Sequence, residues 1–351
     1  MLNLTKTKKT CLQYSFLLLL ICITVYLVST TLDIALIPTL IKLVDKKFIF
    51  LGFLSMIIYM ILESVIINIL INMSHKSSVK FLSLKIATMG VYYNLVTPFA
   101  SGSQPMQIYT LNKYGINLSK STAIITNKTV LFQTIVTIYC GVLIFFNLDI
   151  LKNDMPSILI LMSIGMGINI ITLIGGMLIV LSPNTMKQLI KFIFKILYKL
   201  NIFSSLNRRQ SNINKFIDDY SFSIKAFIKN KKILFISIIL TVIQLTVFFS
   251  ISYCIYKAFN LNGLKFYNIL ALQVFLYMSV SPIPTPGNVG ANEIAFFTIF
   301  ANIFPKDLMG YSVFLYSIYV YYFLVIFCGI FTVHTHYHMG KYKFKKQNYN
   351  L

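Results

Sequence analysis

The sequence predicts an all-α polytopic integral membrane protein with about six full spans, two re-entrant broken helices and both termini in the cytoplasm. Composition is the first reason: 57% of the 351 residues are hydrophobic and only 11% are charged, whereas an average soluble domain is about 25% charged. The sign of the charged residues is the second reason, because the chain has 31 Lys and Arg but only 9 Asp and Glu. A net charge of +22 on an apolar chain is typical of a multi-pass protein with basic cytoplasmic loops.

Six apolar runs are long enough for spanning helices, which need about 20 residues each. The first run follows three lysines and could be mistaken for a secretory signal. It is too long for the apolar part of a signal, and no A-x-A-like cleavage site follows it, so we expect it to be the first span. The six expected spans are residues 12–36, 48–72, 119–146, 156–182, 233–257 and 311–334.

Two further apolar stretches, 81–117 and 266–305, are interrupted by Pro and Gly at a density that no helix continues through. If both crossed the membrane, the basic segment 183–232, with nine Lys and two Arg against two Asp, would lie outside, against the positive-inside rule. Re-entrant segments that enter from opposite faces remove this conflict, although the basic loop 38–47 then lies outside. Ordinary turns between eight conventional helices are the alternative.

The domain organisation follows from these spans. We expect one transmembrane domain over residues 1–340 and a basic cytoplasmic tail over residues 341–351. Within the segment 183–232, lysines recur every four residues between apolar side chains, which predicts a basic amphipathic helix on the anionic inner leaflet. These lysines are Lys187, Lys191, Lys195 and Lys199. We expect no DNA as a partner, because the leaflet is the nearer anion. A homo-oligomer remains open.

Ionisable residues inside apolar spans are costly and are therefore functional candidates. Four qualify: Asp33, Glu63, Lys128 and Glu293. Asp33 is expected near the membrane interface, and Glu63 could serve only to pair two helices. Lys128 and Glu293 are the better candidate pair, because a buried ammonium needs an anionic partner.

Lys128 lies beside a polar stripe on its helix, formed by residues at helical spacing. The stripe consists of Thr122, Thr126, Thr129, Gln133 and Thr137, with Asn127 next to Lys128. It lines either a helix–helix contact, which is common in membranes, or a water-accessible groove. The ammonium group favours the groove.

The two broken segments offer polar backbone and side chains that suit a lipid headgroup. The first would form an uncharged cradle rich in donors, from Ser101, Gly102, Ser103, Gln104 and Gln107. In the second, Gly287, Asn288 and Gly290 would let the backbone approach a ligand closely. With Lys128 adding one positive charge, the set suits a phospholipid headgroup. Alternatively, these residues merely satisfy the ends of broken helices.

We expect no cofactor and no metal site. The five cysteines show no paired spacing and are expected to be thiols used as small apolar residues. His334, His336 and His338 form an H-x-H-x-H pattern, but alternate positions point apart on a helix. An interfacial cluster of His and Tyr is therefore favoured over metal binding.

Two motifs give the chain a family resemblance. TPFASGSQPMQIYTLNKYGINLSKSTAIITNK (residues 97–128), followed by PTPGNVGANE (residues 284–293), resembles the lysylphosphatidylglycerol synthase transmembrane-region family, which includes the membrane half of the bacterial multiple peptide resistance factor. Many members have G-E-x-x-R in the first motif, where Gln104 and Gln107 stand here. Lys128 matches a basic residue typical of the following helix. The second motif keeps Pro284, Pro286, Gly287, Gly290 and Glu293.

The resemblance implies a multi-pass protein of the bacterial plasma membrane that moves aminoacylated phosphatidylglycerol, or another lipid, between leaflets, in connection with resistance to cationic antimicrobial peptides. The full resistance factor appends a soluble domain that takes the aminoacyl group from tRNA. After Tyr337 this chain has only a short Lys-rich tail, so we expect a non-enzymatic protein. The alternatives are a phosphatidylglycerol lysyltransferase, with the segment 183–232 docking lysyl-tRNA, and a membrane partner of a cell-envelope glycosyltransferase.

Overall fold

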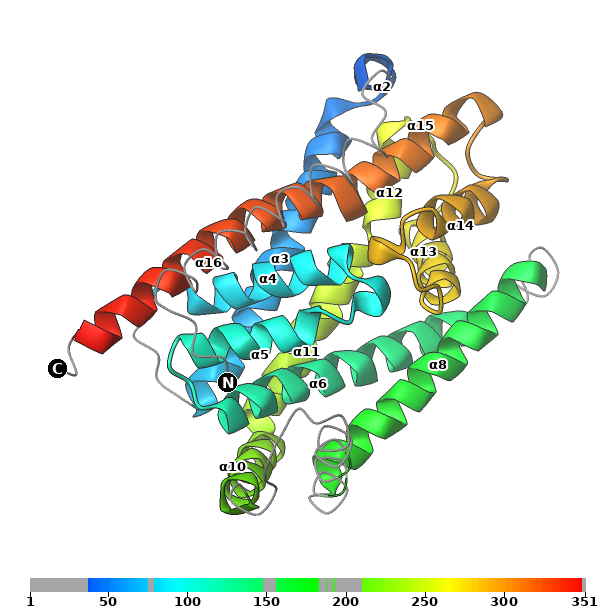
Figure 1. The fold of residues 1–351 in the computed structure, drawn as a ribbon. Coiled ribbons are helices and arrows are strands. Elements are labelled where there is room, and N and C mark those ends of the chain that lie inside the picture. The colour runs from blue at the N-terminus through cyan, green and yellow to red at the C-terminus, as the bar shows by residue number, and fades with distance from the viewer. Residues whose placement is uncertain are drawn as a thin grey trace.

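The computed structural model describes residues 37–74, 79–147, 156–182 and 210–348, together with positions 188 and 192. Every regular element within these ranges is helical, as the fold class predicts. Figure 1 shows long helices with pairs of short helices packed between them. The expected first span, residues 12–36, lies outside the described residues. So do the four regularly spaced lysines of the expected basic helix.

Five helices are long and apolar enough to cross a membrane, and they match five of the expected spans to within a few residues. Two of them are composite, because α11 continues into α12 after one residue and α15 continues through a π-helical segment, η5, into α16. A short helix, α2 (Ile37–Leu43), precedes the first. The five are α3 (Lys46–Ser74), α6 (Leu118–Phe145), α8 (Pro156–Leu181), α11–α12 (Lys231–Phe249 and Ile251–Ala258) and α15–η5–α16 (Lys306–Ser317, Ile318–Phe323 and Leu324–Asn348).

Both interrupted stretches are helical hairpins, in which two short helices pack against each other on either side of a turn. The first hairpin is α4 (Leu82–Val96) and α5 (Ser103–Lys113), joined through η2 (Pro98–Ala100). The second is α13 (Phe266–Val280) and α14 (Ala291–Phe300), joined through η4 (Pro286–Asn288). The breaks are confirmed where Pro and Gly predict them.

We call residues 97–102 the first tip and residues 281–290 the second tip. Thr97 takes an extended conformation, with φ −117° and ψ 143°, because a residue before proline is disfavoured in helical geometry. The two tips touch, since η2 packs against η4 and α4 also packs against η4. Figure 1 shows the turn after α4 next to the turn after α13. Non-helical backbone of both hairpins therefore meets at one place.

Left-handed backbone marks the second tip. Gly287 has φ +60° and Asn288 has φ +56°, a region that glycine adopts without steric cost. A Cβ at Gly287 would stand 2.5 Å from the Tyr321 ring and 3.0 Å from the Leu95 carbonyl oxygen. The tip backbone is thus held tightly between α4 and η5, and only glycine fits there.

Part of the basic segment is an amphipathic helix, α10 (Gln210–Lys229), packed against α6. Its inward face buries Ile217, Tyr220 and Ile224, and the Ser119 hydroxyl donates a 3.4 Å hydrogen bond to Asp219 Oδ2. Residues 210–229 are therefore a helix attached to the start of a spanning helix.

Close packing joins α8 to the second hairpin. A Cβ at Gly165 would lie 1.9 Å from the backbone carbonyl oxygen of Met278 on α13, whereas a Cβ at Gly167 would meet nothing within 4 Å. Small residues allow helices in membranes to approach this closely. The position of α13 therefore depends on the missing side chain of Gly165.

We predict that Gly165→Ala destabilises the protein by about 1–3 kcal/mol, because overpacking against a backbone atom forces helices apart. Gly167→Ala, two residues away on the same helix, should not lower stability. Thermal unfolding of both variants in detergent or nanodiscs measures the difference. Equal unfolding temperatures for the two variants would contradict this account of the α8–α13 contact.

Candidate functional site

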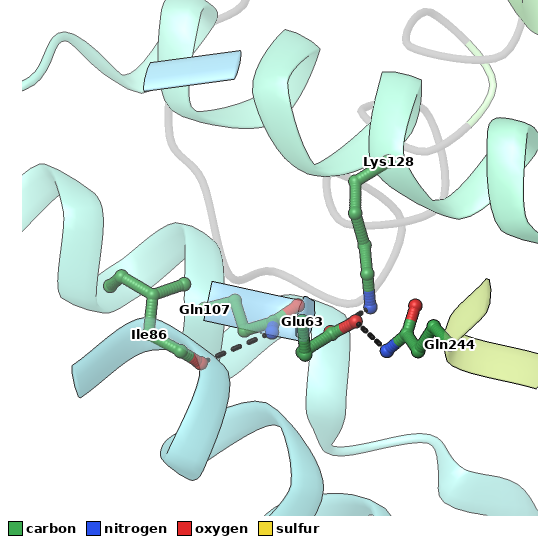
Figure 2. A network of polar contacts seen from close by, with 5 residues as sticks. All are labelled: Glu63, Ile86, Gln107, Lys128 and Gln244. Atoms are coloured by element: carbon green, nitrogen blue, oxygen red, sulfur yellow. Dashed lines mark hydrogen bonds and ion pairs between the residues drawn. The ribbon is translucent and has the colours of Figure 1, made fainter. Parts of the chain in front are cut away.

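A buried ion pair joins three spanning helices in the middle of the bundle. Lys128 Nζ on α6 contacts Glu63 Oε1 on α3, and Gln244 Nε2 on α11 donates a 2.9 Å hydrogen bond to Glu63 Oε2. Figure 2 shows Lys128 and Gln244 converging on Glu63 from different helices. Side-chain exposure is 17% for Lys128 and 5% for Glu63. The ammonium is thus the part of the pair that a ligand reaches more easily.

The expected pairing of Lys128 with Glu293 is wrong. The helix of Lys128, α6, packs directly against α3. This contact places the carboxylate of Glu63, and not that of Glu293, at the Lys128 ammonium group. The reading that Glu63 serves to pair helices describes its contacts correctly. Such a pair is strongly held, because removal of either partner leaves an uncompensated charge in a medium of low dielectric constant.

Glu293 instead fixes the second tip to the last span. Its Oε2 accepts a 2.6 Å hydrogen bond from the Gly290 N–H, which caps the start of α14. Its Oε1 accepts a 2.5 Å hydrogen bond from the Ser317 hydroxyl, one residue before η5. Within the residues that the structure describes, no basic side chain lies within 4 Å of this carboxylate.

The expected donor cradle of the first hairpin is divided between surface and interior. Ser101 and Gln104 are exposed, and Gly102 and Ser103 are half-buried. Gln107 is buried and donates a 3.1 Å hydrogen bond from Nε2 to the Ile86 carbonyl oxygen. Its amide occupies the space over Gly90, where a Cβ would lie 2.0 Å from Gln107 Nε2. Gln107 therefore braces α5 against α4.

At Gln133 the polar stripe of α6 is a helix–helix contact. Gln133 Nε2 donates a 2.5 Å hydrogen bond to Asn169 Oδ1 on α8. Asn169 Nδ2 in turn donates a 3.1 Å hydrogen bond to the Ser281 hydroxyl, at the start of the second tip. Gln133 is thereby linked to this tip through one residue. Asn127, beside Lys128, is buried.

The glycine-rich turn of the second hairpin carries its own supports. Gly287, Asn288 and Gly290 stay partly accessible at the tip surface. Asn292 Nδ2 donates a 3.3 Å hydrogen bond to the Gly287 carbonyl oxygen, and Glu293 holds the Gly290 N–H. Side chains of α14 thus satisfy the backbone of the tip, as buried non-helical backbone in a membrane protein requires.

Sequence reasoning missed four residues that connect these clusters. Gln244 and Asn169 are polar residues within otherwise apolar spans, and this alone could have marked them. Ser317 and Tyr321 carry no such signal, because Ser and Tyr are common in membrane helices. Their roles depend on which face of the last span meets the second tip.

Near the end of α16, His336 points away from His334 and His338, as alternate positions on a helix do, whereas the rings of His334 and His338 lie with their centroids 4.4 Å apart. His336 is buried, and its Nε2 lies 3.0 Å from the Tyr93 hydroxyl of α4. His334 and His338 are exposed. Within the described part of the chain, no group of three or more His, Cys, Asp or Glu side chains is arranged to hold a metal ion.

These features define a multi-pass helical membrane protein with two tip-to-tip helical hairpins and a buried ion pair. Comparison with family models extends this description, because residues 14–328 match the lysylphosphatidylglycerol synthase TM region. The chain belongs to this family, as its two motifs indicate. Comparisons with the curated proteins and with the solved structures give no match.

We predict that Lys128→Met and Glu63→Gln each destabilise the protein by about 3 kcal/mol, because each leaves one buried charge without its partner. The double variant should be less damaged than either single one, since it removes both charges together. Unfolding in nanodiscs provides this double-mutant cycle. Lys231→Met, which removes an exposed ammonium at the start of α11, is the control. Additive effects of the two single substitutions would contradict the coupling.

Proposed function

We propose that the protein moves a phospholipid between the leaflets of the bacterial plasma membrane. In this proposal the headgroup passes the two hairpin tips, while the acyl chains stay in the bilayer. The lipid is an anionic or aminoacylated phospholipid, such as lysylphosphatidylglycerol. Membership of the lysylphosphatidylglycerol synthase family supports a lipid of this kind.

The observation that carries the proposal is the contact between the two tips. Broken helices at membrane depth are tolerated only where protein or a watery cavity satisfies their backbone, and paired broken segments are a feature of transporter substrate sites. Here the two breaks lie between the paired helices α4–α5 and α13–α14, and both breaks meet at one place. A headgroup that follows the tips would find polar groups where lipid-facing surfaces offer none.

The proposed binding residues fall into two groups. Exposed or half-buried residues in the two tips and at the starts of α5 and α14 would contact the headgroup directly: Ser101, Gly102, Ser103, Gln104, Gly287, Asn288, Gly290 and Glu293. Lys128, while paired with Glu63, would donate a hydrogen bond from its ammonium group to the headgroup phosphate. Gln107, Asn127 and Gln133 would hold in place the helices that carry these groups. Exposure supports this division, because a buried, bonded amide such as that of Gln107 has less freedom to bind a ligand.

A link to resistance against cationic antimicrobial peptides follows from electrostatics. Cationic peptides are drawn to anionic membrane surfaces, at about 1 kcal/mol per basic residue. Transfer of an aminoacylated lipid to the outer leaflet would reduce the negative charge of that surface. The protein would then weaken peptide binding through the composition of the membrane.

We predict that full-length protein in liposomes exposes inner-leaflet fluorescent phosphatidylglycerol to an external quencher, which protein-free liposomes do not. The Lys128→Met/Glu63→Gln variant should transport roughly tenfold more slowly, because a charge-assisted hydrogen bond to phosphate is worth about 1.5–3 kcal/mol. Gly167→Ala serves as the matched control. Unchanged transport in the double variant would remove Lys128 from the path.

The same liposomes separate transport from synthesis. Incubation with lysyl-tRNA should produce no lysylated lipid if the chain is a transporter alone. Formation of lysylphosphatidylglycerol without lipid movement would instead establish the transferase alternative.

We predict that the mouths of the two hairpins open to opposite sides of the membrane. A cysteine at Gln104 should react with an impermeant thiol reagent only from the cytoplasmic side, and a cysteine at Asn302, exposed after α14, only from outside. The native thiols Cys140 and Cys328 are buried, Cys254 is half-buried, and Cys11, Cys22 and Cys254 are replaced by serine to keep the background low. Labelling of both positions from one side would overturn the re-entrant topology.

A further inference from the structure

Two hydroxyl groups near the second tip are buried without a hydrogen-bond partner. These are Tyr321 on η5 and Thr285, two residues before Gly287. The Tyr321 residue is only 2% exposed, and the edge of its ring lies against Gly287. A buried hydroxyl that makes no hydrogen bond costs about 1–3 kcal/mol. The fold therefore keeps two polar groups at one turn at a cost that packing alone does not explain.

Two acceptors near this turn carry full or partial negative charge. The Leu95 carbonyl oxygen, in the last turn of α4, is one of the nearest atoms to Gly287, and the C-terminal end of a helix carries partial negative charge. The Glu293 carboxylate is half-buried and is bonded to the Gly290 N–H, three residues after the Gly287 position that the Tyr321 ring contacts. The turn thus lies between the carboxylate of Glu293 and the partially negative end of α4.

No positive charge within the described ranges balances them. Lys128 is neutralised by Glu63, and no basic side chain stands within 4 Å of Glu293. A carboxylate at membrane depth is costly unless it is paired. The Glu293 carboxylate therefore has no cationic partner of its own, whereas Glu63 has Lys128.

We infer that the segment from Thr285 in the second tip to Glu293 at the start of α14 forms with Tyr321 a binding site for a monovalent cation, either a primary ammonium group or an alkali ion. Three donor protons of an ammonium group, or the coordination sphere of an alkali ion, suit carboxylate, carbonyl and hydroxyl oxygens. This inference deepens the proposed function, and it rests on that function only for the idea that a lipid headgroup supplies the ammonium.

An anion at the same place is disfavoured by the cap of α14. The start of a helix normally attracts anions through its free N–H groups, but here Glu293 Oε2, bonded to the Gly290 N–H, already places a negative charge at the start of α14. A phosphate there would have to displace this carboxylate and lie beside its negative charge. The phosphate of a headgroup would be better placed towards Lys128.

The experiment measures thermal unfolding of the full chain in nanodiscs of phosphatidylglycerol, because a ligand that binds the native state raises its stability. Three probes are compared: lysylphosphatidylglycerol, the same lipid with its amino groups acetylated, and sodium chloride against N-methylglucamine chloride at constant ionic strength. A rise with the lysylated but not the acetylated lipid identifies a headgroup ammonium. A rise with sodium alone identifies a free cation.

Three variants test whether this stabilisation comes from the tip. Glu293→Gln keeps a side chain able to cap α14 but should weaken cation binding at least about tenfold, since hydrogen bonds to charged groups are the strong ones. Tyr321→Phe should weaken binding while its ligand-free unfolding temperature stays equal or rises, because it removes an unpartnered hydroxyl. Tyr319→Phe is the matched control: its hydroxyl donates to the Ile49 carbonyl oxygen, so it should lower stability and leave binding intact.

Two results would overturn the inference: no cationic probe stabilises the wild-type protein, or Glu293→Gln responds to these probes as the wild type does. Neither depends on transport. Liposomes that show no lipid movement while the tip still binds a cation would refute the proposed function and leave the cation site standing.

Discussion

The buried contact between Lys128 and Glu63 is the constraint on which the arrangement of the hairpins depends. The first hairpin is carried by the two helices that this pair joins, because α4 packs against α3 and α5 packs against α6. Gln244 adds α11 to the same contact. Apolar packing between membrane helices is weakly directional, since lipid tails are as apolar as the side chains they replace. A charged contact with one geometry therefore sets the rotation of three helices at once.

The same pair determines how charge is distributed around the tips. Because Lys128 and Glu63 compensate each other's charge, the negative charge of Glu293 is the one that a bound ligand would have to compensate. Its carboxylate has a structural task, holding Gly290 and Ser317, yet each oxygen can accept a further hydrogen bond. A headgroup with separate phosphate and ammonium groups would thus meet different chemistry at the ion pair and at the second tip. Discrimination between lipids would depend on both.

Much of the fold was predictable from the sequence, because it depends on local physics. Span positions follow from apolar length, and both breaks follow from Pro98 and from the Pro-Gly run after Val280. The candidate site was less accessible. Glu63 stands alone in an apolar run and Glu293 follows a polar stretch of Pro, Gly and Asn, but sequence gives no information about which of the two faces Lys128. That choice depends on helix rotation and neighbours, as does the position of Tyr321 against Gly287. The topology across the membrane remains a prediction.

Strain and irregularity gather where the second tip meets the last span. The π-helical segment η5 places the Tyr321 ring against Gly287, which together with Asn288 has left-handed backbone, a conformation rare in regular structure. Single π-turns occur frequently at functional sites, because they widen a helix and redirect its side chains. Here the widened turn carries Tyr319 to the Ile49 carbonyl oxygen and Tyr321 to the tip. Through these two tyrosines the same π-turn contacts both α3 and the second tip, so the last span holds the two together at one irregular turn.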